Sequence, residues 1–395
     1  MPRPSSPSRT RSGSGAALGI TMALANLLSY VFVLVLSRAL GPSDFGGFSA
    51  LSAYGIVLSV PAGALQVIVA RHVAGATHDS RGVRTALGVG VALAAATIVA
   101  APLLSSAFRL DTAWSAVWLG LTLVPMTLTG AFQGILLGRD RLVALSVIYV
   151  ATAAGRLAAG AGGAALGLSV AQVFALLLLV AVAVAVLGAW LCRDDLTLAD
   201  DRRLGGELIR ATMSLGAFIA LTNIDVTLAR AYLGDHDSGG YALAATFGRA
   251  MGWGTQFVAL LLVPRMQGPR AARSFRRSLG LILLLGLVGI AVIAAAPEFW
   301  VELAGGAEYA EFGSLAVACV ALGVLWALVQ VSLFAEMGLD SPWLGRFTWC
   351  VVAAQCALVV LWFHDTPYEI VGVSAVGATT IVGAALVRSR RLQHA

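Results

Sequence analysis

Long apolar stretches separated by short polar segments fill the chain from residue 15 to residue 387. Each stretch is close to the roughly 20 residues that a helix needs to cross the hydrocarbon core of a bilayer. The pattern predicts twelve such helices, over 15–37, 46–70, 86–108, 114–138, 142–166, 168–192, 211–233, 241–264, 279–297, 312–336, 347–364 and 367–387. We therefore expect an all-α polytopic membrane protein, with a disordered basic tail over 1–14 and a second basic tail over 388–395.

Composition excludes a soluble globular protein and gives no sign of an enzyme. Hydrophobic residues make up 59% of the chain and charged residues 12%, against about 25% charge in typical soluble domains. All 26 basic residues are arginine, so the chain has no lysine for a phosphate-binding loop or a Schiff base. No metal-binding or CxxC spacing occurs among the four cysteines. We expect no catalytic residues, no metal and no cofactor, and the basic charge has no pattern that suggests nucleic-acid binding.

The arginines occupy every second segment between the predicted helices. With the N-terminus placed in the cytoplasm, 21 of them fall on the cytoplasmic side and two, Arg38 and Arg109, on the other side. Basic residues are retained on the cytoplasmic side of membrane proteins, so both termini are predicted to be cytoplasmic. The remaining three are Arg156, Arg230 and Arg249, which fall within predicted helices.

An internal repeat divides the chain near its middle. The segment 36–48 (LSRALGPSDFGGF) reappears, with one inserted residue, as 228–241 (LARAYLGDHDSGGY), at an offset of 192 to 193 residues. Both copies join an odd-numbered predicted helix to an even-numbered one. An even number of spans in each half implies parallel halves related by an axis along the membrane normal. We expect two six-helix bundles, 15–192 and 211–387, joined by a cytoplasmic linker over 193–210.

Three groups of residues resemble those of a known family. Residues 37–48 with 70–74 resemble the first-loop pattern of polysaccharide-export flippases, the Wzx-type branch of the multidrug/oligosaccharidyl-lipid/polysaccharide (MOP) exporter superfamily. Residues 223–225 followed by 239–244 resemble the seventh and eighth helices of that family. Gly305 and Gly306 with Tyr309 resemble its loop between the ninth and tenth helices. These motifs are rich in glycine and alanine, and they identify the superfamily better than the substrate.

The resemblance implies a flippase that moves a polyprenyl-pyrophosphate-linked oligosaccharide from the inner to the outer leaflet by alternating access. Its implied partners are the lipid-linked glycan, membrane lipids and polysaccharide-assembly enzymes, with a monomeric transport unit. Peptidoglycan-precursor flippases of the superfamily usually have fourteen spans, so a count of twelve disfavours that branch. The absence of lysine and the bias toward alanine, glycine and arginine suggest a bacterial chain, placed in the plasma (inner) membrane.

Three charges inside predicted helices are the main candidates for cargo binding. Arg156, Asp225 and Arg249 lie eight to ten residues from one predicted end of their helices, at a similar level roughly 12–15 Å below the surface. A charge at this depth costs at least about 2.5–3.5 kcal/mol when it faces lipid, so these side chains should face a cavity or each other. Two arginines to one acid suit a pyrophosphate, whose oxygens arginine binds in a bidentate manner.

Asp225 has two interpretations that the sequence leaves open. It either pairs with Arg249 as a structural contact, or it couples transport to a proton or sodium gradient. The repeat places Val33 opposite Asp225, so the acid occurs in only one half, as an ion-coupling residue would. Arg38 and Arg230 are repeat mates near the predicted outer surface, where they either reach the lipid headgroups or contact the glycan; Asn223 is a further cavity candidate.

Two other function classes remain. One is an ion-coupled drug or small-molecule antiporter, of the same superfamily or of the major-facilitator type, which should have an acidic or aromatic cavity. The other is a membrane-embedded glycosyltransferase. That class normally needs a sizeable outer loop, and the longest one expected here is 298–311.

Overall fold

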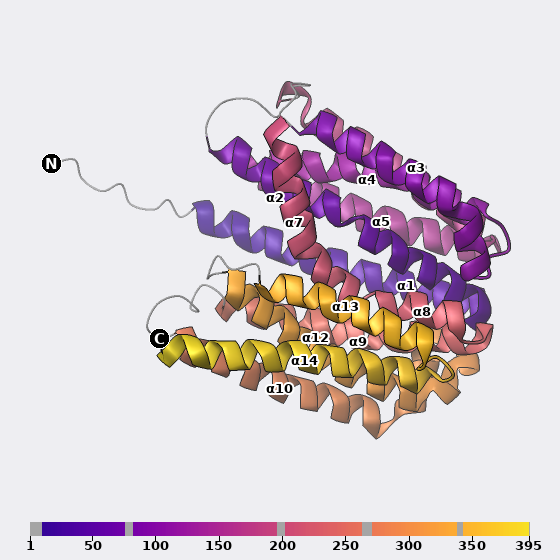
Figure 1. The fold of residues 1–395 in the computed structure, drawn as a ribbon. Coiled ribbons are helices and arrows are strands. Elements are labelled where there is room, and N and C mark those ends of the chain that lie inside the picture. Colours follow the sequence, from indigo (N-terminus) through magenta and orange to yellow (C-terminus); the bar gives the residue numbers. More distant parts are fainter. Residues whose placement is uncertain (1–9, 76–81, 196–201, 263–270, 338–342, 395) are drawn as a thin grey trace. The chain divides into compact units, whose positions relative to one another are not determined.

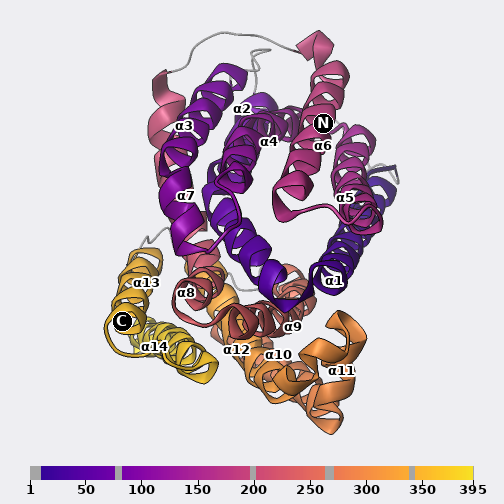
Figure 2. The same ribbon diagram turned by 90° about the vertical axis from the view of Figure 1, so that its right-hand side faces the viewer.

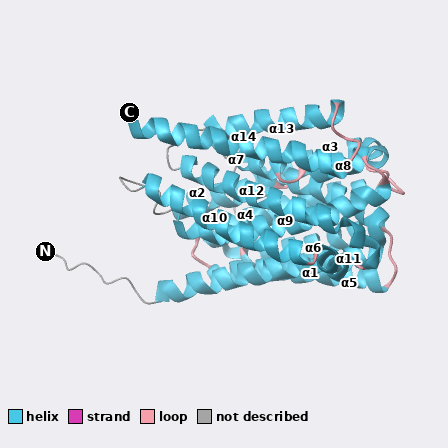
Figure 3. Ribbon diagram, turned by 90° about the horizontal axis from the view of Figure 1, so that it is seen from below, coloured by secondary structure: helices cyan, strands magenta, loops and turns pink. Residues whose placement is uncertain are grey.

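The computed structural model describes residues 10–75, 82–195, 202–262, 271–337 and 343–394. All regular structure in these ranges is helical (Figures 1 and 3). The helices are α1 (Thr10–Leu58), α2 (Val60–Ala74), α3 (Val83–Ala107), α4 (Trp114–Gly138), α5 (Leu142–Ala165), α6 (Val170–Leu191), η1 (Arg193–Asp195), α7 (Arg202–Leu221), α8 (Ile224–Tyr232), α9 (Asp235–Leu262), α10 (Ala271–Ala295), α11 (Pro297–Gly305), η3 (Ala307–Phe312), α12 (Gly313–Met337), α13 (Trp343–Leu361) and α14 (Pro367–His394).

Nine helical stretches of the described residues are long and apolar enough to cross a membrane, or ten if the bent pair α7 and α8 forms one span. One of the nine, Gly19–Ala74, is 56 residues long, which corresponds to about 84 Å of helix against a hydrocarbon core of about 30 Å. It therefore contains two crossings. Counting this stretch as two spans, the bent pair α7 and α8 as one and α9 as one more, the described helices agree with the twelve spans expected. The chain is an all-α multi-pass membrane protein.

The turn between the first two crossings lies at Gly41. Its backbone has φ 68 and ψ 172, a conformation with positive φ that glycine adopts without the strain of a Cβ atom. Pro42 follows, and proline is well suited to the first turn of a helix. The second crossing is interrupted at Ser59, and α2 begins at Val60 with Pro61 in its first turn. Pro125, by contrast, lies within the continuous helix α4.

The described contacts divide the chain into two compact units. The first comprises 1–36, 58–102 and 112–212, and the second comprises 37–57, 103–111 and 213–395. This grouping differs from the predicted bundles 15–192 and 211–387 because two segments of the first half, 37–57 and 103–111, make most of their contacts with the second half. The division of the sequence into two six-helix repeats stays a prediction.

In the first unit α4 is the central helix and contacts both α2 and α6. Three glycines at intervals of four residues let α4 approach α2 closely. A Cβ atom at Gly134 would lie 2.8 Å from the carbonyl oxygen of Gln66, and one at Gly138 would lie 2.7 Å from that of Ala70. The apolar core beside this contact contains Val69, Phe132, Ile135, Leu136, Leu145, Ile148, Val184 and Cys192. Gly134 and Gly138 therefore permit close packing of α4 on α2.

In the second unit α12 has the corresponding central place, with contacts to α9, α10 and α14 (Figure 2). Gly248 of α9 and Gly323 of α12 meet backbone to backbone, because a Cβ atom on either would overlap a carbonyl group of the other helix. By the repeat, α12 corresponds to α4, while α9 and α14 correspond to the second and sixth crossings. Each unit thus has one helix that packs against several others, α4 in the first and α12 in the second.

Candidate functional site

The seventh span is broken, in contrast to the continuous helix expected over 211–233. Helix α7 ends at Leu221, α8 begins at Ile224, and the two are bent by 49°. At the break, the Asn223 side-chain amide donates to the carbonyl of Ile219 at 2.8 Å, and the Thr222 hydroxyl donates to that of Phe218 at 3.1 Å. Asparagine and threonine side chains offer the backbone an alternative to helical hydrogen bonds, which is the physical reason for the break.

Asp225 lies directly after this break, as the second residue of α8. It is fully buried, and its Oδ2 accepts a hydrogen bond of 3.0 Å from the Tyr241 hydroxyl of α9. Its Oδ1 has no hydrogen-bond partner in the described part of the chain. A fully buried carboxylate with a free oxygen is costly, so it needs a nearby positive charge or a proton.

The nearby positive charge is Arg249 of α9. Its Nη2 is 3.8 Å from Asp225 Oδ1, beyond hydrogen-bond distance, and its Nε donates to the carbonyl of Thr222 at 3.3 Å. The Arg249 side chain is 21% exposed, whereas Asp225 is 0% exposed. The structure therefore brings Asp225, Arg249 and Asn223 together at the break, in a loose ion pair whose arginine retains access to the surface.

Tyr241 is a member of this cluster that the sequence analysis did not identify. The signal was available in the repeat, where Tyr241 stands opposite Phe48 and Asp225 stands opposite Val33. The second half thus carries an acid and a hydroxyl where the first half carries two apolar side chains. The Asp225 carboxylate and the Tyr241 hydroxyl hydrogen-bond to each other. Two positions at which the halves differ, apolar in the first and polar in the second, therefore indicated the site.

Arg156 belongs to α5 in the first unit. Its guanidinium carbon lies 5.0 Å from the centroid of the Phe32 ring of α1, a cation–π contact. No carboxylate lies within ion-pair distance of Arg156 in the residues that the structure describes. Because Arg156 and the Asp225 cluster lie in different units, their predicted common level stays a prediction.

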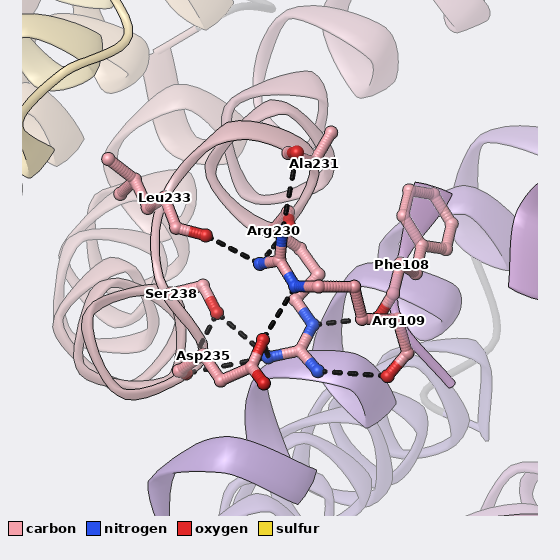
Figure 4. A network of polar contacts seen from close by, with 7 residues as sticks. All are labelled: Phe108, Arg109, Arg230, Ala231, Leu233, Asp235 and Ser238. Atoms are coloured by element: carbon pink, nitrogen blue, oxygen red, sulfur yellow. Dashed lines mark hydrogen bonds and ion pairs between the residues drawn. The ribbon is translucent and has the colours of Figure 1, made fainter. Parts of the chain in front are cut away.

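Arg230 is buried and is part of a network of polar contacts (Figure 4). Its Nε donates to the carbonyl of Phe108 at 2.8 Å and its Nη2 to that of Arg109 at 3.2 Å. Its Nη1 donates to the Ser238 hydroxyl at 3.0 Å and pairs with Asp235 at 3.2 Å. These carbonyls end helix α3, and a cation at a helix C-terminus is favourable because the last carbonyls lack helical partners.

Arg109 makes the reciprocal contact in the same network. Its Nη2 donates to the carbonyl of Arg230 at 2.6 Å and also to that of Leu233, at the end of α8, and its Nε binds Asp235 at 2.6 Å (Figure 4). The backbone of Arg109 has a positive φ of 46, at a helix end where glycine is usual. These side-chain bonds offset the strain. We call Arg109, Arg230 and Asp235 the arginine clasp.

Arg38, the repeat mate of Arg230, contacts a third helix end. Its guanidinium donates to the carbonyls of Leu303 and Ala304, which end α11. Helix α11 and the following η3 occupy most of the segment 298–311 that was expected to be a loop. Arg38 and Arg230 both donate hydrogen bonds to backbone carbonyls, and their predicted contact with the cargo stays a prediction.

The two copies of the repeat contact each other at their glycines. A Cβ atom at Gly46 would lie 2.9 Å from the Ser238 hydroxyl and 3.0 Å from the backbone nitrogen of Gly239. One at Gly239 would overlap the backbone of Pro42. The glycines of the repeat therefore permit a close backbone contact, and the arginine clasp lies directly beside it, with Arg230 Nη1 3.1 Å from the same position on Gly46.

No family model and no curated protein matches this chain. Solved structures do share its fold. The lipid II flippase MurJ in an inward closed conformation gives a TM-score of 0.74 at 9% identity over 95% of this chain and 87% of the other. A multidrug resistance MATE family transporter of the MOP superfamily, in its inward-facing conformation, gives 0.68 at 16% identity over 94% and 96%. A MOP superfamily transporter from Pyrococcus furiosus, described as having a binding pocket of reverse polarity, gives 0.59 at 15% identity over 95% and 92%. The chain therefore shares its fold with these three transporters.

Proposed function

We propose that this protein is a membrane transporter that moves a polyprenyl-pyrophosphate-linked oligosaccharide between leaflets by alternating access. The fold supports transport in general, since the similar structures are of transporters and flippases rather than enzymes. The arginine distribution supports placement in a bacterial plasma membrane with both termini in the cytoplasm. The cargo would pass to polysaccharide-assembly enzymes on the outer side.

Arg156 is the observation that carries the proposed cargo class. It lies nine residues before the end of α5, about 14 Å along the helix from that end. An arginine at this depth that has an aromatic ring but no acid as its described partner needs water or an anion beside its guanidinium. A pyrophosphate supplies the anion and matches the planar guanidinium with pairs of oxygens.

Proteoliposomes with a fluorescent polyprenyl-pyrophosphate oligosaccharide test this proposal. We expect protein-dependent flipping by the native chain and a loss of at least tenfold in Arg156→Ala and in Arg249→Ala, since a hydrogen bond to a charged group contributes about 1.5–3 kcal/mol. Arg71→Ala is the control, because it removes the same charge from an exposed position near the end of α2. Native protein that leaves the lipid unflipped would contradict the proposed function.

A drug antiporter is the second candidate, because the MATE family structure has a TM-score of 0.68 with this chain. The two functions differ in the charge that the cargo must have. An organic cation would be repelled by Arg156, whereas an anionic lipid would be attracted. Transport of organic cations against a proton gradient by the native protein, unaffected by Arg156→Ala, would favour the antiporter.

Asp225 is the proposed coupling residue, for a proton or a sodium ion. We expect Asp225→Asn to fold and to flip cargo without a gradient, but to lose the acceleration that an imposed proton or sodium gradient gives the native protein. The amide still accepts the Tyr241 hydrogen bond, so packing is preserved while the titratable charge is removed. Tyr241→Phe is the matched control, because it deletes the hydrogen bond and keeps the carboxylate. Equal gradient dependence in Asp225→Asn and native protein would leave Asp225 with only a structural role.

A further inference from the structure

Phe32 is placed so that its ring supports the guanidinium of Arg156. The ring is 1% exposed, in the part of α1 that belongs to the first unit, and its centroid is 5.0 Å from the guanidinium carbon. Both residues belong to the same compact unit, so this contact is defined independently of the second unit. A phenylalanine that serves only to fill the core packs against apolar side chains, whereas Phe32 also contacts Arg156, the one arginine within α5.

Gly160 allows the ring to take this place. It follows Arg156 by four residues and so lies on the same face of α5. A Cβ atom on Gly160 would be 2.6 Å from Cδ2 and 2.8 Å from Cε2 of Phe32, closer than carbon atoms can approach. The ring therefore lies directly against the α5 backbone, one turn from the arginine. Any larger residue at 160 would have to displace the ring.

The contact fixes the guanidinium without using its hydrogen-bond donors. A cation–π contact attracts the guanidinium to the ring without using any of its five N–H donors. Among the described residues, Arg156 makes this ring contact and no hydrogen bond or ion pair with a protein acceptor. Its donors thus stay available for an oxyanion that offers two oxygens.

We infer that Phe32 and Gly160 are positioning residues that hold the Arg156 guanidinium beside the Phe32 ring, so that its N–H donors can bind a phosphate-type oxyanion of the cargo. This inference rests on the proposed function and adds the means by which the same site is pre-organised. Holding a long side chain in one orientation before binding lowers the entropic cost of binding. Losing the support should therefore weaken cargo affinity more than it slows the transport step.

Cargo affinity and flipping rate of four variants test the inference. Phe32→Leu, which keeps an apolar side chain, should raise the half-saturating concentration of the polyprenyl-pyrophosphate cargo about five- to tenfold with a smaller change in maximal rate. Phe32→Tyr retains an aromatic face and should restore native affinity. Gly160→Ala should resemble Phe32→Leu, and Gly162→Ala is its matched control, because a Cβ atom at 162 meets nothing within 4 Å.

A double-variant comparison separates positioning from general packing. In an Arg156→Ala background, Phe32→Leu should have no further effect on cargo affinity, because there is no guanidinium left to position. An equal loss in both backgrounds, or native affinity in Phe32→Leu, would overturn the inference while the proposed function stands. Native protein that neither binds nor flips the cargo would overturn both.

Discussion

Gly239→Ala is expected to destabilise the protein by about 3 kcal/mol and to abolish transport. The added methyl group would fall on the backbone of Pro42, and neither that backbone nor α9 can move aside without opening the contact between the two copies of the repeat. Overpacking of a site normally costs about 1–3 kcal/mol, and a clash with backbone, which has no alternative rotamer, belongs at the upper end of that range.

The measurement is the thermal unfolding midpoint in detergent, followed by the flipping assay. Gly234→Ala is the matched control in the same turn, since its Cβ atom would meet only the Asp237 carboxylate at 3.9 Å, an ordinary contact. Gly234 has no positive φ, so alanine adds no backbone strain there. Similar unfolding midpoints for Gly239→Ala and Gly234→Ala would contradict the close contact between Gly239 and Pro42.

Arg230→Ala should have the second largest effect, a loss of about 3 kcal/mol. The substitution leaves the carbonyls of Phe108 and Arg109 and the hydroxyl of Ser238 without their donor in a buried place. Each buried polar group without a partner costs about 1–3 kcal/mol, but Asp235 is half-exposed, so water compensates the lost ion pair. Arg230→Lys should recover only part of the loss, because an ammonium group cannot span the same acceptors.

Arg38→Ala is the matched control for this prediction, since Arg38 is the repeat mate of Arg230 and also donates to carbonyls at a helix end. Its side chain is exposed, so water can replace it and the loss should be below about 1 kcal/mol. Unfolding midpoints in detergent measure both. Native stability of Arg230→Ala with a selective loss of cargo affinity would instead support Arg230 as a cargo-binding residue.

Hydropathy and charge predicted the helical architecture because those signals are local. The predicted helices follow from apolar runs, and each run can be recognised within one segment of about 20 residues. The break at Thr222 and Asn223 escaped because a hydropathy window averages two polar residues into an apolar run. Hydropathy does not register that the Thr222 and Asn223 side chains compete with the backbone for hydrogen bonds.

The charged positions were predicted in part. Depth along the helices singled out Asp225 and Arg249, which the structure brings to within 3.8 Å of each other. The partners of Arg38 and Arg230 lie 265 and 122 residues away in sequence, and backbone carbonyls at helix ends carry no residue signature. A single sequence therefore indicates where an arginine lies in the bilayer but not which helix end it caps.

The contact of Arg38 with Leu303 also sets an order of events during synthesis. The acceptor lies 265 residues downstream, and at about 5–20 residues per second a ribosome needs roughly 13–53 s to reach it. Arg38 is thus inserted long before its final partners exist, and must be hydrated or held by lipid phosphates until α11 arrives. A chain truncated within α10 would lack α11, and Arg38 would then lack the carbonyls of Leu303 and Ala304 that it binds in the native structure.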